Sequence, residues 1–278
     1  MSETEAEQRA SGAIAVAVAQ FAPGAHSEVN FDAIADFAAV AAARGADLVV
    51  FPEYSSYFVD PVDARFLDHA EPLGGPFTTA LAELADALGT AIVAGFAERT
   101  DDPGRFSNTL AAAVPGEGIR AVYRKQHLYD AFGARESDVV LPGELEEPQL
   151  FTVGGFTVAL QTCYDLRFPE ITRTLVDAGA ELVVVPSEWV RGPLKEHHWR
   201  TLITARAIEN TIFVAAADHT GPVGVGSSVI VDPMGVVLAD AGERPGVSVA
   251  WLSRERLDAV RSTNPALSLR RYSVVPTR

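Results

Sequence analysis

The chain has 278 residues and a formal net charge of −15 at pH 7, which argues against nucleic acid or an anionic membrane surface as a partner. Its composition, 48% hydrophobic and 21% charged, is that of an ordinary globular protein, and its length suits one large domain or two small ones. No apolar stretch approaches the roughly 18 residues of a transmembrane helix. A single cysteine and no recognisable export signal favour the cytoplasm.

The first residues differ from the rest of the chain. Residues 1–12 (MSETEAEQRASG) are polar and acidic and are expected to form a disordered tail. Beyond them no low-complexity linker and no repeat of fixed period occurs, so residues 13–278 are expected to form one domain.

Short β-rich segments alternate with helical ones along the chain. Strands are predicted at 13–21, 47–53, 90–98, 107–115, 119–125, 156–162, 181–187, 212–218, 227–233, 235–240 and 246–252. Helices are predicted at 30–46, at 76–89, directly after Cys163 and at 195–211. This pattern indicates a mixed α/β fold whose sheets are covered by helices.

The only cysteine, Cys163, lies between a predicted strand and a predicted helix. A lone thiol serves packing, metal ligation or chemistry, and this segment offers no His or Cys that could join it on a metal. Free cysteines are usually buried and inert, but reacting groups of α/β enzymes often follow a strand at this kind of junction. A helix beginning after Cys163 would also lower the pKa of the thiol. Cys163 is therefore a candidate nucleophile.

Two carboxylates and one ammonium group follow other strands. Glu53 ends one strand, Lys125 ends another, and Glu136 lies in the loop that Lys125 opens. Each alone is best explained as a surface charge. Their shared position favours a joint site, since open α/β sheets gather active sites at this edge.

Three segments together resemble the nitrilase superfamily of carbon–nitrogen hydrolases. They are FPEYS at 51–55, YRKQHLYD at 123–130 and CYDLRFPE at 163–170, and the similarity continues over most of the chain from residue 13 onward. The resemblance implies a four-layer α-β-β-α sandwich that forms a homodimer or a higher homo-oligomer. It also implies a catalytic triad of Glu53, Lys125 and Cys163.

The resemblance further implies roles for these residues. Glu53 is expected to be the general base, Lys125 and the backbone N–H of Tyr164 to stabilise the oxyanion, and Glu136 to orient Lys125 or the substrate. An amide would be hydrolysed to a carboxylic acid and ammonia through a thioester on Cys163. No metal or organic cofactor is implied.

The sequence after the nucleophile indicates the branch of the family. CYDLRFPE resembles the Nit amidases, which act on ω-amides of 2-oxo acids or on deaminated glutathione. Such substrates are small carboxylate-bearing amides, so a cation near the pocket is expected. Arg167 is the main candidate, with an ion pair to Asp165 or Glu170 as its alternative explanation. Hydrolysis of N-carbamoyl amino acids, hydrolysis of nitriles and a catalytically idle binding or scaffold protein are alternative functions.

Other polar residues receive simpler interpretations. Ser187 and Trp189 are expected to contribute to the substrate pocket. Arg191 and Lys195 are further candidates for the cation near the pocket, but their place in a predicted loop around Gly192 and Pro193 favours solvated side chains. Glu188 is expected to be a surface charge. No HExxH or comparable ligand spacing occurs, so no metal site is expected.

Overall fold

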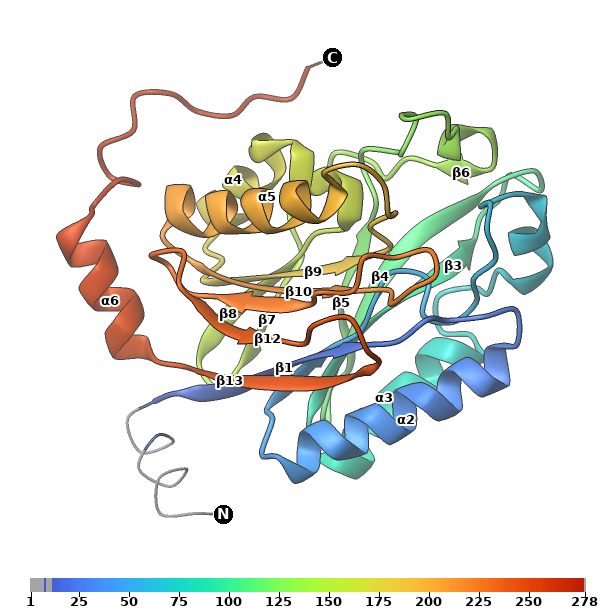
Figure 1. Ribbon diagram of the computed structural model, residues 1–278, viewed down its shortest axis with the longest axis horizontal. Helices are drawn as coiled ribbons and strands as arrows, with labels where there is room; N and C mark the ends of the chain where they lie inside the picture. The colour runs from blue at the N-terminus through green and yellow to red at the C-terminus, as the bar shows by residue number, and fades with distance from the viewer. Residues whose placement is uncertain (1–7, 9–11, 278) are drawn as a thin grey trace.

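The computed structural model describes residue 8 and residues 12–277. The predicted tail at 1–12 therefore lies almost entirely outside the described residues. Two sheets pack face to face, and helices cover the outer face of each, which gives the expected α-β-β-α sandwich (Figure 1). Helices α2 (Ser27–Ala43) and α3 (Pro76–Leu88) lie on one side, and α4 (Pro169–Asp177) and α5 (Lys195–Asn210) lie on the other.

Each sheet mixes parallel and antiparallel strands. The first has the order β13-β1-β2-β3-β4-β5, with β6 paired to β4, and the second has the order β12-β11-β10-β9-β8-β7. The strands of the first sheet are β1 (Ile14–Gln20), β2 (Leu48–Val50), β3 (Ala91–Arg99), β4 (Phe106–Val114), β5 (Gly118–Arg124), β6 (Val140–Leu141) and β13 (Gly246–Leu252). Those of the second are β7 (Leu150–Val153), β8 (Phe156–Leu160), β9 (Leu182–Ser187), β10 (Phe213–Asp218), β11 (Val229–Val231) and β12 (Val237–Asp240).

The side chains of β1 explain how the layers are held together. Successive side chains of a strand point to opposite faces of its sheet. Val16 and Val18 therefore join the core between the two sheets, and Ala17 and Ala19 pack against the layer of α2 and α3. All seven residues of β1 are buried, so a continuous apolar strand without alternation is what this position requires.

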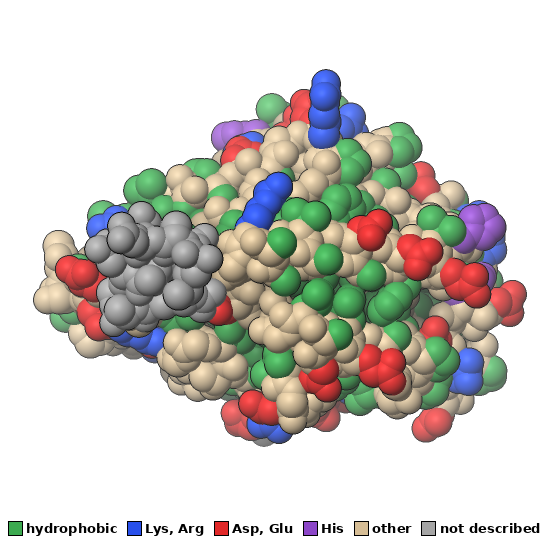
Figure 2. All heavy atoms as spheres, turned by 90° about the horizontal axis from the view of Figure 1, so that it is seen from below, with side chains coloured by type: hydrophobic (Ala, Val, Ile, Leu, Met, Phe, Trp, Pro, Cys, Tyr) green, Lys and Arg blue, Asp and Glu red, His purple; other side chains and the backbone are tan. Residues whose placement is uncertain are grey.

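The outer face of the first helical layer is seen in Figure 2. Acidic side chains are spread among apolar ones on this face, while basic side chains lie mostly toward its edge. The acidic excess of the composition is thus visible on this surface. Among the described residues, no helix is both long enough and apolar enough to cross a membrane.

Several predicted elements have different bounds in the structure. Cys163 opens a short 3₁₀ helix, Cys163–Arg167, and α4 begins only at Pro169. The predicted strand at 47–53 is shortened to β2, because the chain turns at Glu53 and Tyr54 adopts a positive φ of 53°. The last helix, α6 (Arg254–Thr263), was not predicted; Ser253 caps it by accepting a hydrogen bond from the Arg256 N–H.

The parallel strands decide where the functional residues meet. Strands β1, β2 and β3 run parallel, as do β8, β9 and β10, and β5 runs in the same direction as β3 because both are antiparallel to β4. The segments that follow β2, β5, β8, β9 and β10 therefore leave their sheets at corresponding edges. This arrangement brings the loops that carry Glu53, Lys125, Cys163, Glu188 and His219 together.

Candidate active site

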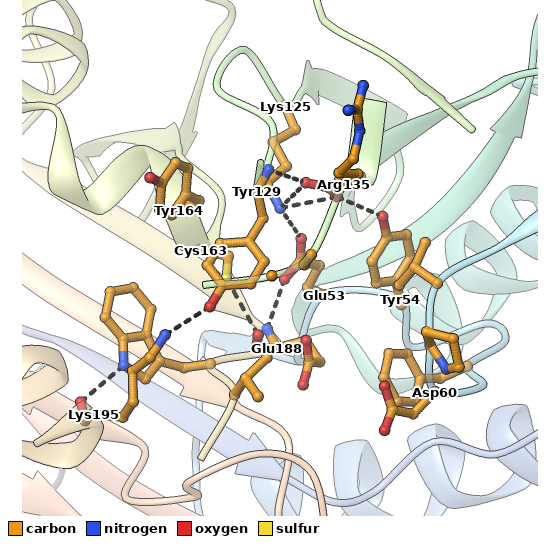
Figure 3. A pocket seen from close by; sticks show the side chains of 18 of the residues that line it. Glu53, Tyr54, Asp60, Lys125, Tyr129, Arg135, Cys163, Tyr164, Glu188 and Lys195 are labelled. Carbon is orange, nitrogen blue, oxygen red and sulfur yellow. Dashed lines mark hydrogen bonds and ion pairs between the residues drawn. The ribbon is translucent and has the colours of Figure 1, made fainter. Parts of the chain in front are cut away.

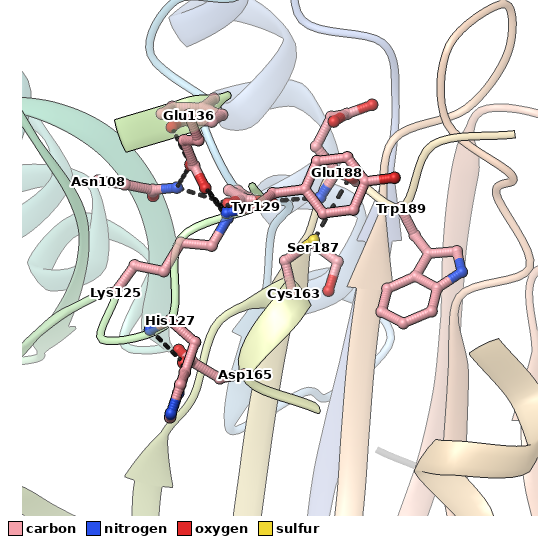
Figure 4. A network of polar contacts seen from close by, with 12 residues as sticks. Asn108, Lys125, His127, Tyr129, Glu136, Cys163, Asp165, Ser187, Glu188 and Trp189 are labelled. Atoms are coloured by element: carbon pink, nitrogen blue, oxygen red, sulfur yellow. Dashed lines mark hydrogen bonds and ion pairs between the residues drawn. The ribbon is translucent and has the colours of Figure 1, made fainter. Parts of the chain in front are cut away.

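Glu53, Lys125 and Glu136 form a buried ionic cluster beside Cys163 (Figures 3 and 4). Lys125 Nζ lies 2.9 Å from Glu53 Oε1 and 3.0 Å from Glu136 Oε2, and all three side chains are at most 6% exposed. Burying one ammonium group between two carboxylates requires close pairing of the charges, which this geometry provides. The structure thus brings the four residues of the predicted catalytic set into one place.

Neutral hydrogen-bond donors complete the cluster. Asn108 Nδ2 donates to Glu53 Oε1 at 2.5 Å and to Glu136 Oε1 at 3.2 Å. The Tyr54 hydroxyl donates to Glu136 Oε1 at 2.8 Å, and the Tyr129 N–H donates to Glu136 Oε2 at 2.6 Å. Asn108 and Tyr54 were not among the predicted site residues. Asn108 lies near the start of β4 between Ser107 and Thr109, so no isolated polar residue in an apolar strand marked it in the sequence.

The position of Glu53 is fixed by its backbone as well as by its carboxylate. Its Oε2 accepts a hydrogen bond from the Glu188 N–H at 2.7 Å, and its carbonyl oxygen lies 2.7 Å from His219 Nε2. Burial lowers the pKa of His219 to about 4, so the ring is neutral and can donate to this carbonyl. On the other side, a Cβ at Gly95 would lie 2.6 Å from Tyr54 N and 2.8 Å from Glu53 Cα. Only glycine allows β3 to approach the Glu53 turn so closely.

Cys163 occupies a strained position at the end of β8. Its φ is 42°, in the left-handed region that non-glycine residues seldom adopt, and its thiol donates to the Glu188 carbonyl oxygen at 3.4 Å. Such a turn exposes a nucleophile at the edge of a sheet.

The predicted lowering of the Cys163 pKa is wrong. Burial raises the pKa of the thiol well above its usual range, and the Glu53 charge raises it further, although Lys125 opposes this effect. The five-residue 3₁₀ helix contributes too small a dipole to reverse the effect of burial. The Cys163 side chain is therefore a neutral thiol at rest, and attack by its sulfur would need a base.

The charges in the cluster are mutually stabilised. Burial alone would lower the pKa of Lys125, but Glu136 and Glu53 raise it well above its usual range. Burial alone would raise the pKa of Glu136, but Lys125 and the Tyr129 N–H bring it below its usual range. The ammonium and the Glu136 carboxylate are therefore both charged at neutral pH.

Cys163 lies in a cavity of about 390 Å³ that also contains the ionic cluster. Tyr129, Tyr164, Arg167, Glu188, Trp189 and Lys195 complete much of its wall. A cavity of this size suits a small molecule. Ser187, in contrast, is fully buried and donates to the Val185 carbonyl oxygen at 3.3 Å, so it is not on the wall of the cavity.

One end of the cavity carries two cations among aromatic rings. The Arg167 guanidinium lies 4.8 Å from the centre of the Trp189 ring, and Lys195 Nζ lies 3.9 Å from that of Phe132 and 2.8 Å from the Tyr129 hydroxyl. Burial and the nearby Arg167 lower the pKa of Lys195. The expectation that Lys195 is solvated is therefore wrong: it is 7% exposed, directly after Leu194, which adopts a positive φ of 60° before α5. Arg191 instead donates to the Gly224 carbonyl oxygen, away from this cavity.

Arg167 does not form the ion pair that was its alternative explanation. Asp165 instead contacts the His127 ring at 2.8 Å and accepts a hydrogen bond from the Tyr123 hydroxyl at 2.7 Å. Within the described part of the chain, Arg167 Nε and Nη2 are buried and have no hydrogen-bond partner. Unused donors of a guanidinium beside a cavity are suited to an anionic ligand.

Glu188 was expected to be a surface charge, and this expectation is wrong. Its side chain lines the cavity, and its Oε1 is buried without a hydrogen-bond partner among the described residues. Burial raises the pKa of this carboxyl well above its usual range, and Glu53 and Asp218 raise it further. The residue directly follows β9, the same kind of position that singled out Glu53, and that signal was overlooked. Across the described residues, no group of three or more His, Cys, Asp or Glu side chains could hold a metal ion.

Comparison with known proteins agrees with this geometry. A family model described as carbon–nitrogen hydrolase matches residues 15–262. The protein named deaminated glutathione amidase from Escherichia coli O157:H7 is 42% identical over 260 residues, which are 93% of this chain and 97% of that protein. The protein of the same name from Bos taurus is 35% identical and covers 92% of this chain and 81% of its own length.

Solved structures show the same fold. The C. elegans NitFhit protein has a TM-score of 0.84 and 29% identity; the match covers 94% of this chain but only 66% of that one. An amidase from Nesterenkonia sp. AN1, in which fluoroacetamide added its acetamide moiety covalently at the active-site cysteine, has a TM-score of 0.76 and 30% identity. That match covers 93% of this chain and 94% of the amidase. The chain belongs to the carbon–nitrogen hydrolase family.

Proposed function

We propose that the protein is an amidase that hydrolyses a small carboxylate-bearing amide through a thioester on Cys163. One observation carries the proposal: a single cavity holds a thiol beside a buried Glu–Lys–Glu cluster at one place and an unpaired guanidinium at another. The first arrangement suits attack on an unreactive amide carbonyl, and the second suits a carboxylate on the same substrate.

In the first half of the reaction, Sγ attacks the amide carbon while Glu53 takes the thiol proton. The raised pKa of the thiol supports a transfer that accompanies attack rather than a preformed thiolate. The carbonyl oxygen becomes an oxyanion, held by Lys125 Nζ and by the backbone N–H of Tyr164. The C–N bond then breaks as Glu53 returns the proton to the departing nitrogen.

In the second half, water replaces the amine. Glu53 removes a proton from the water, whose oxygen bonds to the thioester carbon, and the C–S bond breaks to release the carboxylic acid. The proton returns to the sulfur, so Glu53 and Cys163 regain their starting states. Glu136 keeps Lys125 in place throughout, which its contacts with Lys125, Tyr54 and the Tyr129 N–H support.

The acyl group is expected to carry a carboxylate at the cationic end of the cavity. Arg167 presents planar N–H donors that match a carboxylate in geometry, and Lys195 adds a second positive charge. The relatives named deaminated glutathione amidase support this class of substrate. Deaminated glutathione and 2-oxoglutaramate carry the same 2-oxoglutaryl group; the first releases an amine, and only the second releases ammonia.

The test is hydrolysis of these two amides by the wild-type protein and by Cys163→Ala. We expect the wild type to release 2-oxoglutarate from at least one of them and the variant to release none. Release of carbon dioxide from an N-carbamoyl amino acid, or turnover of a nitrile, with neither amide cleaved would overturn the proposal. A wild-type thiol that does not react with iodoacetamide, combined with no turnover, would indicate an idle scaffold.

We also propose that residues 13–278 form one domain, that it assembles as a homodimer or a larger homo-oligomer, and that it works in the cytoplasm. The family match, which runs across both sheets, supports the first point. The resemblance implies a dimer contact through the helices that flank the nucleophile segment, and the position of α4 and α5 there, on the outside of the sandwich, supports the second. A free thiol at the centre of the site supports a reducing compartment. Sedimentation of the purified protein tests the assembly.

A further inference from the structure

Glu188 is a charged residue of the cavity that the proposed reaction leaves without a role. Its backbone contacts both reacting side chains: its N–H donates to Glu53 Oε2 at 2.7 Å, and its carbonyl accepts from the Cys163 thiol at 3.4 Å. Because the backbone is fixed at these two points, the side chain enters the cavity at a defined place next to Glu53. It is not a mobile surface group.

The side chain of Glu188 points away from the cationic end of the cavity. Neighbouring residues of an extended chain direct their side chains to opposite sides. Figure 4 shows the Glu188 carboxyl and the Trp189 ring on different sides of their backbone, and in Figure 3 Glu188 lies between Lys195 and Asp60. Trp189 packs against Arg167. Glu188 therefore belongs to the other end of the cavity, with Glu53 and Asp60.

The carboxyl of Glu188 lacks the partners that a buried acid ordinarily has. Oε1 is buried without a hydrogen bond among the described residues. The strongest charges acting on it are those of Glu53 and Asp218, which disfavour ionisation, while Lys125 acts in the opposite sense. A neutral carboxyl has one O–H donor and free acceptor positions, so it can bind the donor and acceptor atoms of a peptide group. An unpartnered group of this kind on a cavity wall is available for a hydrogen bond to a ligand.

The direction of the substrate follows from the proposed function, on which this inference rests. If Arg167 holds the acyl carboxylate, the scissile carbonyl lies at Cys163 and the amide nitrogen must leave toward Glu53, which protonates it. A substituent on that nitrogen continues past Glu53 in the same direction. Glu188, whose N–H donates to Glu53 Oε2, lies beside this path, and Asp60 lines the same end of the cavity.

We infer that Glu188 is the specificity residue for the amine half of the substrate, and that its carboxyl hydrogen-bonds to the peptide-like substituent of an N-substituted amide. The residue is then dispensable when the leaving group is ammonia. It distinguishes substituted amides from primary amides that share one acyl group.

A comparison of deaminated glutathione with 2-oxoglutaramate separates recognition of the amine half from effects on the shared acyl half. Both give the same thioester on Cys163, so hydrolysis of that thioester proceeds identically from either substrate, and only formation of the thioester differs. We would measure kcat/KM for both amides with the wild type, Glu188→Ala and Glu188→Gln. Glu196→Ala, at an exposed position in the first turn of α5, serves as the matched control.

Glu188→Ala is expected to lower kcat/KM for deaminated glutathione about tenfold, mainly through KM, and to change that for 2-oxoglutaramate by less than about twofold. Glu188→Gln, which keeps a donor and an acceptor, should stay close to the wild type on both, as should Glu196→Ala. Equal losses of Glu188→Ala on both amides, or no loss on either, would overturn the inference alone. Inactivity of the wild type on both amides would overturn the proposed function and this inference with it.

Discussion

The carboxylates of the ionic cluster, Glu53 and Glu136, differ from the charged groups of the substrate wall, Arg167 and Glu188, in how their polar atoms are satisfied. All four residues line one cavity. Every carboxylate oxygen of Glu53 and Glu136 has at least one donor within 3.2 Å. On the wall, by contrast, Arg167 Nε, Arg167 Nη2 and Glu188 Oε1 are buried without partners in the described part of the chain. Preorganised groups need their partners before the substrate arrives, whereas recognition groups gain theirs from the substrate. The difference separates residues that should affect kcat from residues that should affect KM.

Lys125→Met removes the cation of the ionic cluster and should have the largest effect on kcat among these variants. The variant loses an oxyanion donor, so we expect kcat to fall by about 10²–10³ or more. It also leaves two buried carboxylates facing each other without a cation, which should lower the free energy of unfolding by about 3–5 kcal/mol. Steady-state kinetics and urea unfolding at pH 7 measure the two effects.

Arg124→Met is the control for this variant. Arg124 is the neighbouring residue, and its ion pair with Glu98 is 39% exposed on the arginine side and lies outside the cavity. Its loss should leave kcat within about twofold, since the pair contacts no reacting group. A Lys125→Met enzyme with wild-type kcat would contradict the catalytic role of the cluster.

Arg167→Met removes the unpaired guanidinium from the wall and should act on binding. We expect KM for 2-oxoglutaramate to rise about 10- to 100-fold, because a charge-assisted bidentate contact is lost. KM for a neutral amide of similar length should change little. An equal rise for the neutral amide would show that Arg167 acts through packing on Trp189 and not through its charge.

Gly95→Ala should shift the turn that carries Glu53 without changing a residue of the substrate wall. The added Cβ would lie 2.6 Å from Tyr54 N, so the turn that carries Glu53 must shift. We expect kcat to fall about tenfold with KM nearly unchanged, and the free energy of unfolding to fall by about 1–3 kcal/mol. Gly104→Ala, in an exposed loop where the nearest atom is 3.4 Å away, should alter neither quantity. A change in KM larger than that in kcat would mean that the two regions are not separable.

Much of the cluster could be predicted from sequence because its members share a local position. Glu53, Lys125 and Cys163 each follow a strand, and three motifs at fixed places in the chain point to them. The layers and most strands could be predicted for a similar reason, since β1 and its neighbours are continuous apolar segments. These features depend on patterns of a few adjacent residues.

Arg167 and Trp189 of the substrate wall were expected from the sequence, but the burial of Lys195 and Glu188 was not. The burial of Lys195 depends on the rings of Tyr129 and Phe132 beside it, and that of Glu188 depends on the loops after β2 and β10. The raised pKa of Cys163 likewise results from burial by segments distant in sequence. Burial of this kind arises from tertiary contacts, and a position after a strand, such as that of Glu188, indicates a place near the site but not the degree of burial.

The smallest expected effect concerns His219, which supports the cluster through the Glu53 carbonyl without contacting the substrate. Its pKa is about 4 in the folded protein against 6.5 for the free side chain, so the unfolded chain binds the proton first as the pH falls. The stability that depends on the neutral ring is therefore fully present well above pH 6.5 and is lost between pH 6.5 and 4. Between pH 6.5 and 5.5 the free energy of unfolding should fall by about 1 kcal/mol from this residue.

His219→Gln tests this expectation because glutamine can keep an N–H donor toward the Glu53 carbonyl but does not titrate. Urea unfolding at pH 6.5 and at pH 5.5 should show a decrease for the wild type that is larger than that of the variant by about 1 kcal/mol. The other histidines and the carboxyls of Glu188 and Asp218 contribute equally to both proteins, so the difference isolates His219. Parallel pH dependence in the two proteins would mean that the ring is not held neutral. The link between the cluster and β10 would then depend on packing against Phe58, whose ring centre lies 4.7 Å from that of His219, rather than on the hydrogen bond.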